Sequence, residues 1–337
     1  MSGTRKASGC LFGLAIGDAL AAPTEFLSFD EIIEQYGVNG PAEPSDHVTD
    51  DTQMMLAVAE ALLEAEKPFE PLSLERALRD RFIEWAQSPE NTRAPNATCM
   101  QACDRLADGE DWLDATALIS KGTAANMRVA PVGLLPLGKD GVTPRTRGAI
   151  AQFQAALTHA HPTALAAADL TAAAIVDLVS GGDIIELTQR LRDYCESQRL
   201  IYHETWLGEL WNRPEIQTRE EFISVGWDDC VAMLDRIDAG LAKMPRETNP
   251  CEETGEGWIA EEAFGTAMLC FLMFPDDPVA AIRRAATTSG DSDALAAITG
   301  ALCGAHLGFD AWPTRWIEGI EYRERIERIA SAWDGAW

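Results

Sequence analysis

Apolar residues recur along this chain at the three- and four-residue spacing of helices, and no segment alternates apolar and polar residues as a half-buried strand does. Proline and glycine interrupt the pattern at helical lengths. The pattern predicts an all-α fold with helices, in chain order, at 7–22, 29–36, 54–63, 74–85, 98–106, 163–179, 184–197, 206–210, 225–244, 278–288, 295–307 and 317–337, and an apolar helical run ending at 274.

Two acidic pairs stand where predicted helices begin. Asp50 and Asp51 follow Thr49, and Asp291 and Asp293 echo them near the far end of the chain. Thr49 or Asp50 can cap the first helix, and acid in a first turn suits the positive end of the helix dipole. If the two helix starts lie together in the fold, each pair of like charges at contact distance costs about 4 kcal/mol at an effective dielectric near 20. Protons or cations must then neutralise the cluster, and hard oxygen ligands favour magnesium, manganese or calcium over zinc.

The acidic pairs also bear on domain organisation. A chain of 337 residues could hold two average domains. No linker-like segment separates the pairs, so a shared site predicts one compact multi-helix domain over residues 1–337. Asp18, on the otherwise apolar first helix, needs a partner if buried. It is either a structural acceptor or a group behind the site.

The charge balance restricts the partners. Lys+Arg 27 against Asp+Glu 54 gives a formal net charge of −27, which repels nucleic acid and anionic membranes. A cationic or arginine-bearing protein partner is favoured, although the acid could simply keep the protein soluble. The apolar stretches are interrupted and read as too short to span a bilayer. No signal-peptide pattern is evident, and a cytoplasmic location is expected.

Cysteine and histidine give weaker signals. Cys99 and Cys103, one helical turn apart, are predicted to pack in the core. His159 and His161 alternate in a turn with no other histidine or cysteine at a suitable spacing. Hydrogen bonding, or a ligand contact by one of them, is therefore predicted rather than zinc binding. Small residues at 122–125 could bind phosphate through backbone N–H groups, without matching a Walker or dinucleotide motif.

Five segments together resemble a known family. They read GLAIGDALAAPTEF at 13–26, VTDDTQMML at 48–56, KGTAANMRVAP at 121–131, THAHP at 158–162 and GDSDALAAITGALCGAHLGFDAWP at 290–313. In order and spacing the chain resembles the ADP-ribosylglycohydrolases, particularly the bacterial dinitrogenase-reductase-activating type. The resemblance implies an all-helical single domain with a dinuclear Mg²⁺ or Mn²⁺ site.

The resemblance also implies roles for individual residues. The expected metal ligands are Thr49, Asp50, Asp51, Asp291 and Asp293. Glu25 falls on the acidic position beside the metals, and the expected catalytic carboxylates are Glu25, Asp50 and Asp51. The expected substrate contacts are Gly122, Thr123, Met127, His159, Ser289 and Gly290.

Two departures from the family pattern affect these expectations. Ala294 stands where the family has a threonine or serine hydroxyl that binds metal, so one metal is expected to bind more weakly or to take an extra water. The phosphate loop departs from the usual GNGAAMR at Thr123, Ala124 and Asn126. This departure affects the expected substrate geometry more than the fold.

The implied reaction is metal-dependent hydrolysis of the bond between ADP-ribose and a protein side chain, most simply arginine; serine or another acceptor stays open. The implied partner is an ADP-ribosylated protein. An alternative is an immunity protein that binds ADP-ribose or a basic ADP-ribosyltransferase toxin, with or without turnover. A third hypothesis, a structural crystallin-like relative, predicts no bound metal.

Overall fold

The computed structural model describes residues 4–243 and 248–337, and these residues form helices and loops without strands. Their pairing outside helices is limited to two isolated β-bridges, Ala117 with His159 and Gly122 with Ile259. The all-α prediction is confirmed. The α-helices are α1 (Lys6–Ala21), α2 (Phe29–Tyr36), α3 (Asp50–Glu64), α4 (Pro71–Ala86), α5 (Ala97–Ala107), α6 (Trp112–Ala115), α7 (Ala130–Gly133), α8 (Pro144–Ala156), α9 (Pro162–Val179), α10 (Leu187–Gln198), α11 (Glu204–Leu207), α12 (Arg219–Lys243), α13 (Cys251–Thr254), α14 (Ala260–Met273), α15 (Pro278–Ala285), α16 (Ser292–Leu307), α17 (Thr314–Gly319) and α18 (Arg323–Asp334). Short 3₁₀ helices are η1 (Thr123–Ala125), η2 (Ile184–Glu186) and η3 (Phe309–Ala311).

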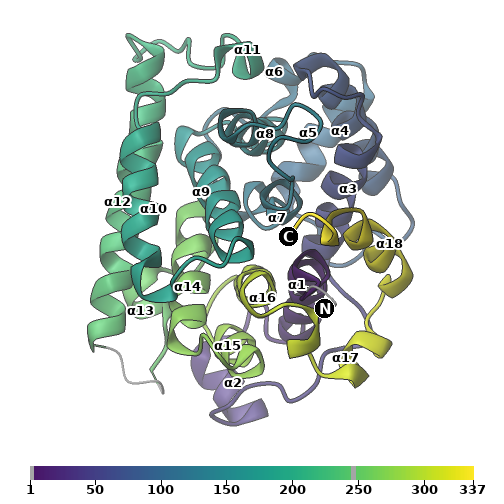
Figure 1. The fold of residues 1–337 in the computed structure, drawn as a ribbon, viewed down its shortest axis with the longest axis vertical. Helices are drawn as coiled ribbons and strands as arrows, with labels where there is room; N and C mark the ends of the chain where they lie inside the picture. Colours follow the sequence, from purple (N-terminus) through teal and green to yellow (C-terminus); the bar gives the residue numbers. More distant parts are fainter. Residues whose placement is uncertain (1–3, 244–247) are drawn as a thin grey trace.

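The closest helix pair joins the two ends of the chain. α1 and α16 lie side by side in the lower centre of Figure 1. A Cβ atom on Gly13 would overlap the carbonyl oxygen of Gly300, and one on Gly304 would overlap that of Gly9. Glycine is required at these positions because the two backbones touch. The two helices are antiparallel, because Gly9 faces Gly304 and Gly13 faces Gly300. The end of α1 therefore lies beside the start of α16.

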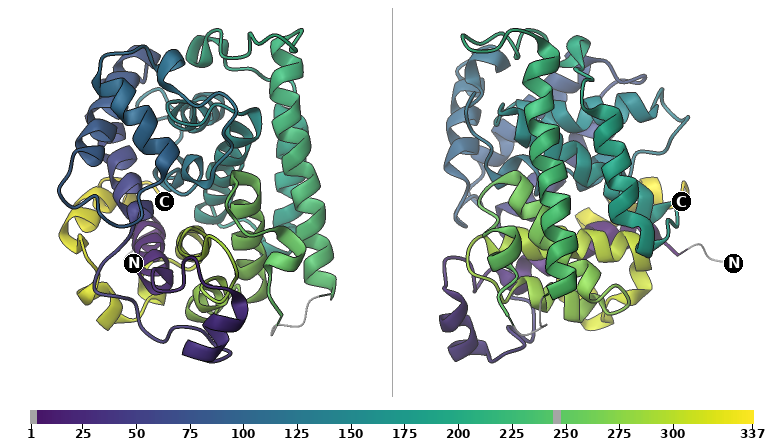
Figure 2. Two further views of the ribbon diagram at one scale, coloured as in Figure 1. Left: turned by 180° about the vertical axis from the view of Figure 1, so that it is seen from behind. Right: turned by 90° about the vertical axis from the view of Figure 1, so that its left-hand side faces the viewer.

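Other helices surround this pair. Most residues of α3, α9 and α14 are buried, as expected for core helices that are apolar on all sides. α12 and α10 stand together along one side of the molecule (Figures 1 and 2). Cys99 and Cys103 are buried in the core, which confirms their predicted packing.

Three predicted elements differ substantially from the structure. α12 begins at Arg219 instead of 225, because Phe222 and Ile223 extend its buried face; residue 244, its predicted end, lies outside the described residues. α11 ends before Gly208, which adopts a φ of 49°. The tail forms two helices, α17 and α18, in place of the single helix predicted over 317–337.

α8 was not predicted at all. Arg147, Gln152 and Gln154 interrupt the apolar pattern, yet they are buried and hydrogen-bonded inside the protein. Gln152 donates to Asp169 at 2.9 Å, and the Arg147 guanidinium donates to the Leu135 carbonyl at 2.8 Å. Hydrophobic periodicity does not reveal a helix whose buried residues include hydrogen-bonded polar side chains.

The prediction that every apolar stretch is too short to span a bilayer is wrong for α9. Its 18 residues are long and apolar enough by length and composition alone. Of this segment, however, 83% is buried inside the protein, where α9 packs against α8, α12 and α16. A core helix meets the same length and composition criterion.

Candidate active site

The first acidic pair lies at the start of α3, held there by the end of α1. Thr49 is the N-cap residue, and its Oγ1 accepts a hydrogen bond from the Asp51 N–H at 3.4 Å. Asp18 accepts from the Thr49 N–H at 2.9 Å and from the Thr52 N–H at 3.0 Å. These N–H groups have no partner within the helix, so Asp18 supplies the acceptors that they need. Asp18 is a structural acceptor, one of its two predicted roles.

The second acidic pair meets Glu25. Carboxylate oxygens of Glu25, Asp291 and Asp293 all lie within 4.8 Å of one another. Glu25 follows α1 and the aspartates begin α16, so the close contact of these helices brings them together. Asp50 and Asp51 lie outside this tightest group, but near enough for their charges to act on it.

Six carboxyl groups therefore share one region: Asp18, Glu25, Asp50, Asp51, Asp291 and Asp293. Burial raises the pKa of Glu25 to about 9, with further contributions from the charges of Asp293 and Asp50. Burial raises the pKa of Asp50 to about 8, against the hydrogen bond donated by the Asn96 N–H at 3.0 Å. Burial and the Asp293 charge raise the pKa of Asp18 to about 7. The cluster is therefore expected to hold protons, or to bind cations in their place.

The donor set suits a hard divalent cation. Asp51 Oδ1 is buried without a hydrogen-bond partner, which is costly unless another group occupies its lone pairs. Carboxylate oxygens are the ligands that Mg²⁺ and Mn²⁺ prefer. Ala294, 1% exposed, offers no oxygen through its side chain. The residues present fit the metals that the sequence implied.

The predicted phosphate loop and His159 lie together. A Cβ atom on Gly122 would be 3.0 Å from His159 Nε2, and this nitrogen is buried without a hydrogen-bond partner. Its other ring nitrogen, Nδ1, lies 2.8 Å from Thr158 Oγ1. Burial, together with the Arg128 charge, lowers the pKa of His159 to about 3. The imidazole is therefore neutral at physiological pH. The neighbouring His161 caps α9, accepting from the Thr163 N–H at 3.2 Å.

Buried Arg128 connects this loop with the Asp50 side of the site. It donates to Thr158 Oγ1 at 2.8 Å and to Gln154 Oε1 at 2.8 Å, and it contacts the Cys99 sulfur at 3.3 Å. Cys99 belongs to α5, whose N-cap residue Asn96 donates its N–H to Asp50. The two halves of the site thus share one internal polar network.

Four predicted substrate residues are already engaged within the protein. Thr123 donates its N–H to the Trp258 carbonyl and its hydroxyl to the Gly257 carbonyl. Met127 is 4% exposed and belongs to the core. Ser289 Oγ accepts from Asn249 at 2.8 Å. A Cβ atom on Gly290 would overlap the Glu256 carbonyl, and its φ is 113°. Ser289 and Gly290 nevertheless lie directly before the Asp291 carboxylate.

A segment that was not predicted from the sequence joins the parts of the site. In the segment 255–260, the Glu256 carbonyl accepts from the Asp291 N–H at 2.9 Å and the Trp258 carbonyl accepts from the Thr123 N–H at 3.2 Å. Gly255 and Gly257 have φ values of 97° and 83°. Two glycines flanking one residue in a polar loop were the available signal for a specialised backbone.

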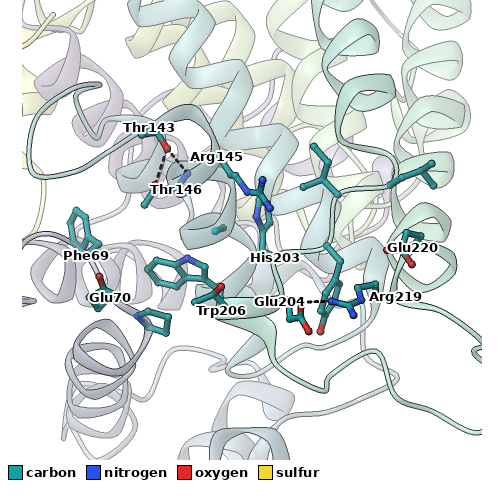
Figure 3. A pocket seen from close by; sticks show the side chains of 16 residues that line it. Phe69, Glu70, Thr143, Arg145, Thr146, His203, Glu204, Trp206, Arg219 and Glu220 are labelled. Carbon is teal, nitrogen blue, oxygen red and sulfur yellow. Dashed lines mark hydrogen bonds and ion pairs between the residues drawn. The ribbon is translucent and has the colours of Figure 1, made fainter.

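A separate cavity of about 580 Å³ lies between α8, α11 and the start of α12 (Figure 3). None of the predicted site residues lines it. Glu204 and Arg219 form an ion pair across its floor, and Thr143 and Thr146 share a hydrogen bond at 2.8 Å. His203, which also lines the cavity, has its Nε2 buried without a hydrogen-bond partner.

Comparison with known proteins decides the family. The sequence model of the ADP-ribosylglycohydrolases matches residues 2–336. The chain belongs to the ADP-ribosylglycohydrolase family. This membership supports an ADP-ribosyl hydrolase activity and explains why the acidic helix starts converge.

Individual relatives are distant but cover most of the chain. An uncharacterized protein of Archaeoglobus fulgidus is 29% identical, with 97% of this chain and 95% of the relative covered. The ADP-ribosylarginine hydrolase Tri1 of Serratia proteamaculans is 26% identical, with 96% and 78% covered. The ADP-ribosyl-[dinitrogen reductase] glycohydrolase of Rhodospirillum rubrum is 25% identical, with 96% and 92% covered.

A solved structure supports the fold. A chain of an ADP-ribosylglycohydrolase-related protein complex superposes with a TM-score of 0.71 at 23% identity, over 99% of this chain and 98% of that one. The all-helical arrangement expected from the family resemblance is therefore confirmed.

Proposed function

We propose that this protein hydrolyses the N-glycosidic bond between ADP-ribose and an arginine side chain of a modified protein, using two Mg²⁺ or Mn²⁺ ions. The carboxylate group formed by Glu25, Asp291 and Asp293 is the observation that supports this proposal most directly. The names of two relatives, an ADP-ribosylarginine hydrolase and an ADP-ribosyl-dinitrogen-reductase glycohydrolase, favour a protein-linked substrate and, in the first case, arginine.

Within this proposal the ligands are Thr49, Asp50, Asp51, Asp291 and Asp293. When bound, the ions would polarise the attacking water and orient the ribose. Because the side chain of Ala294 has no oxygen, one of the two metal positions has one ligand fewer. The ion at that position would bind more weakly than the other.

The chain's own residues then bind substrate and move one proton. The 122–127 loop would lie against the diphosphate, although its Thr123, Asn126 and Met127 N–H groups already donate to backbone carbonyls within the protein. Neutral His159 offers its unpartnered Nε2 to the ADP-ribose. Bound cations would offset the burial and neighbouring charges that raise the pKa of Glu25 to about 9. The deprotonated, half-buried Glu25 would then take a proton from the attacking water. The water oxygen bonds to the anomeric carbon through an oxocarbenium-like transition state, and the carbon–nitrogen bond breaks. The proton passes to the released guanidino nitrogen.

The test is release of free ADP-ribose from two labelled proteins, one modified on arginine and one on serine, in Mg²⁺, in Mn²⁺ and in chelator. We expect metal-dependent release from the arginine-linked protein, and at least a hundredfold loss in Asp50→Asn and Asp293→Asn. Asp46→Asn, an exposed acid four residues before Asp50, is the matched control and should retain activity.

Other outcomes distinguish the alternatives. Release from the serine-linked protein alone would mean that the enzyme acts on ADP-ribosylated serine rather than arginine. No release by the wild type, or full release by both aspartate variants, would reject hydrolysis at this site. Toxin binding stays a prediction, and protection from a transferase that survives in Asp50→Asn would favour it.

A further inference from the structure

The turn that presents Glu25 has a strained backbone. Phe26, the next residue, adopts a φ of 65°, in the left-handed region that residues with a Cβ atom disfavour. Its ring is 67% exposed, so burial in the core does not hold it there. On one side the Leu27 N–H donates to the Thr24 carbonyl at 3.1 Å, and on the other Ser28 caps α2. Glu25 itself makes one backbone bond, from its N–H to the Ala21 carbonyl at 3.2 Å.

The Phe26 ring stacks on Trp258. The ring centroids are 5.7 Å apart and the planes make an angle of 16°. Trp258 is itself 40% exposed, so two large aromatic side chains meet at the surface beside an acidic site. Stacked aromatic pairs are stabilising beyond the area they bury, and here the stack joins the Glu25 turn to the 255–260 segment.

Trp258 also contacts the phosphate loop through its backbone. Its carbonyl accepts from the Thr123 N–H at 3.2 Å, and the Thr123 hydroxyl donates to the adjacent Gly257 carbonyl. One residue therefore holds the Glu25 turn with its side chain and the 122–127 loop with its main chain. Both partners precede Trp258 in the sequence, Phe26 by 232 residues and Thr123 by 135.

We propose that Trp258 is a positioning residue: its stack on Phe26 holds Glu25 beside Asp291 and Asp293, and its bond to Thr123 makes that position respond to a diphosphate ligand in the 122–127 loop. Trp258 acts through Phe26 and does not need to touch the reacting atoms. The inference rests on the proposed function for its kinetic consequence, but the structural coupling can be measured without turnover.

The kinetic test compares Trp258→Leu, which keeps apolar volume without a ring, with Trp258→Phe, which keeps the ring. We expect Trp258→Leu to lower kcat about 3- to 10-fold, the range of an aromatic pair, with a smaller change in KM. Trp258→Phe should restore kcat to within about twofold of wild type. Failure of phenylalanine to restore activity would overturn the role of the stack.

The partner of Trp258 is tested by a double-mutant cycle. Phe26→Leu should reproduce the defect of Trp258→Leu, and the double variant should be no worse than either single variant, because both remove the same interaction. Fully additive losses would show that the two rings act independently and would overturn the inference.

A readout independent of activity uses ¹⁹F NMR of protein labelled with 5-fluorotryptophan. The Trp258 resonance is assigned by its loss in Trp258→Phe, and the other tryptophans serve as internal references. In the wild type, Mg²⁺ and ADP-ribose should each shift this resonance. In Phe26→Leu the Mg²⁺-induced shift should be largely lost and the ADP-ribose-induced shift kept.

The two proposals can fail separately. A wild type that releases no ADP-ribose but shows these shifts would reject the proposed function and keep the coupling. A Trp258 resonance that ignores Mg²⁺ in the wild type, or responds equally in Phe26→Leu, would reject the coupling whatever the activity.

Discussion

Glu321 accepts a hydrogen bond from Nη2 of Arg93 at 2.9 Å and, through its other oxygen, one from the Val48 N–H at 2.9 Å. Arg93 in turn donates to the Val48 carbonyl at 2.8 Å. This pair encloses the residue before Thr49 and ties the turn between α17 and α18 to the segment that starts α3. The charged tail of the chain therefore helps to hold the first acidic helix start in place.

Replacing Glu321 should loosen the first acidic helix start. In Glu321→Gln the charge-assisted bonds weaken, and we expect the free energy of unfolding to fall by about 1–2 kcal/mol. Mg²⁺ affinity should fall as well, because Thr49 and Asp50 follow directly. Urea denaturation and calorimetric titration measure the two effects. Glu318→Gln, an exposed acid three residues earlier, is the control; equal behaviour of the two variants would contradict this prediction.

The contact of α1 with α16 predicts a large cost for one methyl group. Gly300→Ala places a Cβ atom against the Gly13 carbonyl, and overpacking of this kind costs about 1–3 kcal/mol. Gly319→Ala adds the same atom in α17 where no heavy atom lies within 4 Å. Higher helix propensity favours alanine in both, so the difference in free energy of unfolding isolates the contact. Equal stabilities would contradict the close packing.

Without metal, the protein should lose stability as pH rises. The folded-state pKa values of Asp18, Asp50 and Glu25 are raised to about 7, 8 and 9, above their unfolded values near 4. The folded state therefore binds these protons more tightly, and the stabilisation present below about pH 4 is lost as pH rises through about 7 to 9. Thermal unfolding in chelator across this range measures the decline.

Mg²⁺ should flatten that decline, because the cation supplies the neutralisation that protons otherwise provide. Asp293→Asn should flatten it in chelator, since it removes one charge that raises the pKa of several neighbours. Asp46→Asn should leave the slope unchanged. Stability that rises with pH in chelator would contradict the electrostatic description of the site.

His159 should bind substrate as a neutral ring. With its pKa lowered to about 3 by burial and the Arg128 charge, it should not titrate in NMR spectra recorded between about pH 5 and 8. His159→Ala should weaken ADP-ribose binding about 3- to 10-fold, the contribution of one hydrogen bond. His47→Ala, at an exposed position, is the control. A His159 resonance that titrates near pH 6.5 would contradict the prediction.

Much of the candidate site could be predicted because its side chains sit in recognisable local patterns. A threonine followed by two aspartates marks a helix start whether or not anything faces it, and the GD-x-D run marks another. The roles of Trp258 and Phe26 were not predicted, since an exposed aromatic residue in a turn or beside a glycine has no local signature of function. The single-domain organisation, the cytoplasmic location and the roles of the site residues stay predictions.

The sequence by itself determined the helical fold, the acidic helix starts and the family, because these depend on periodicity and short motifs that each segment contains. Only the tertiary structure decided that Glu25 joins Asp291 and Asp293, that α8 buries paired polar groups, and that Trp258 contacts both the Glu25 turn and the Thr123 loop. These relationships depend on distances between segments far apart in the chain. Those distances are set by close packing, above all where the glycines of α1 and α16 bring the two ends of the chain together.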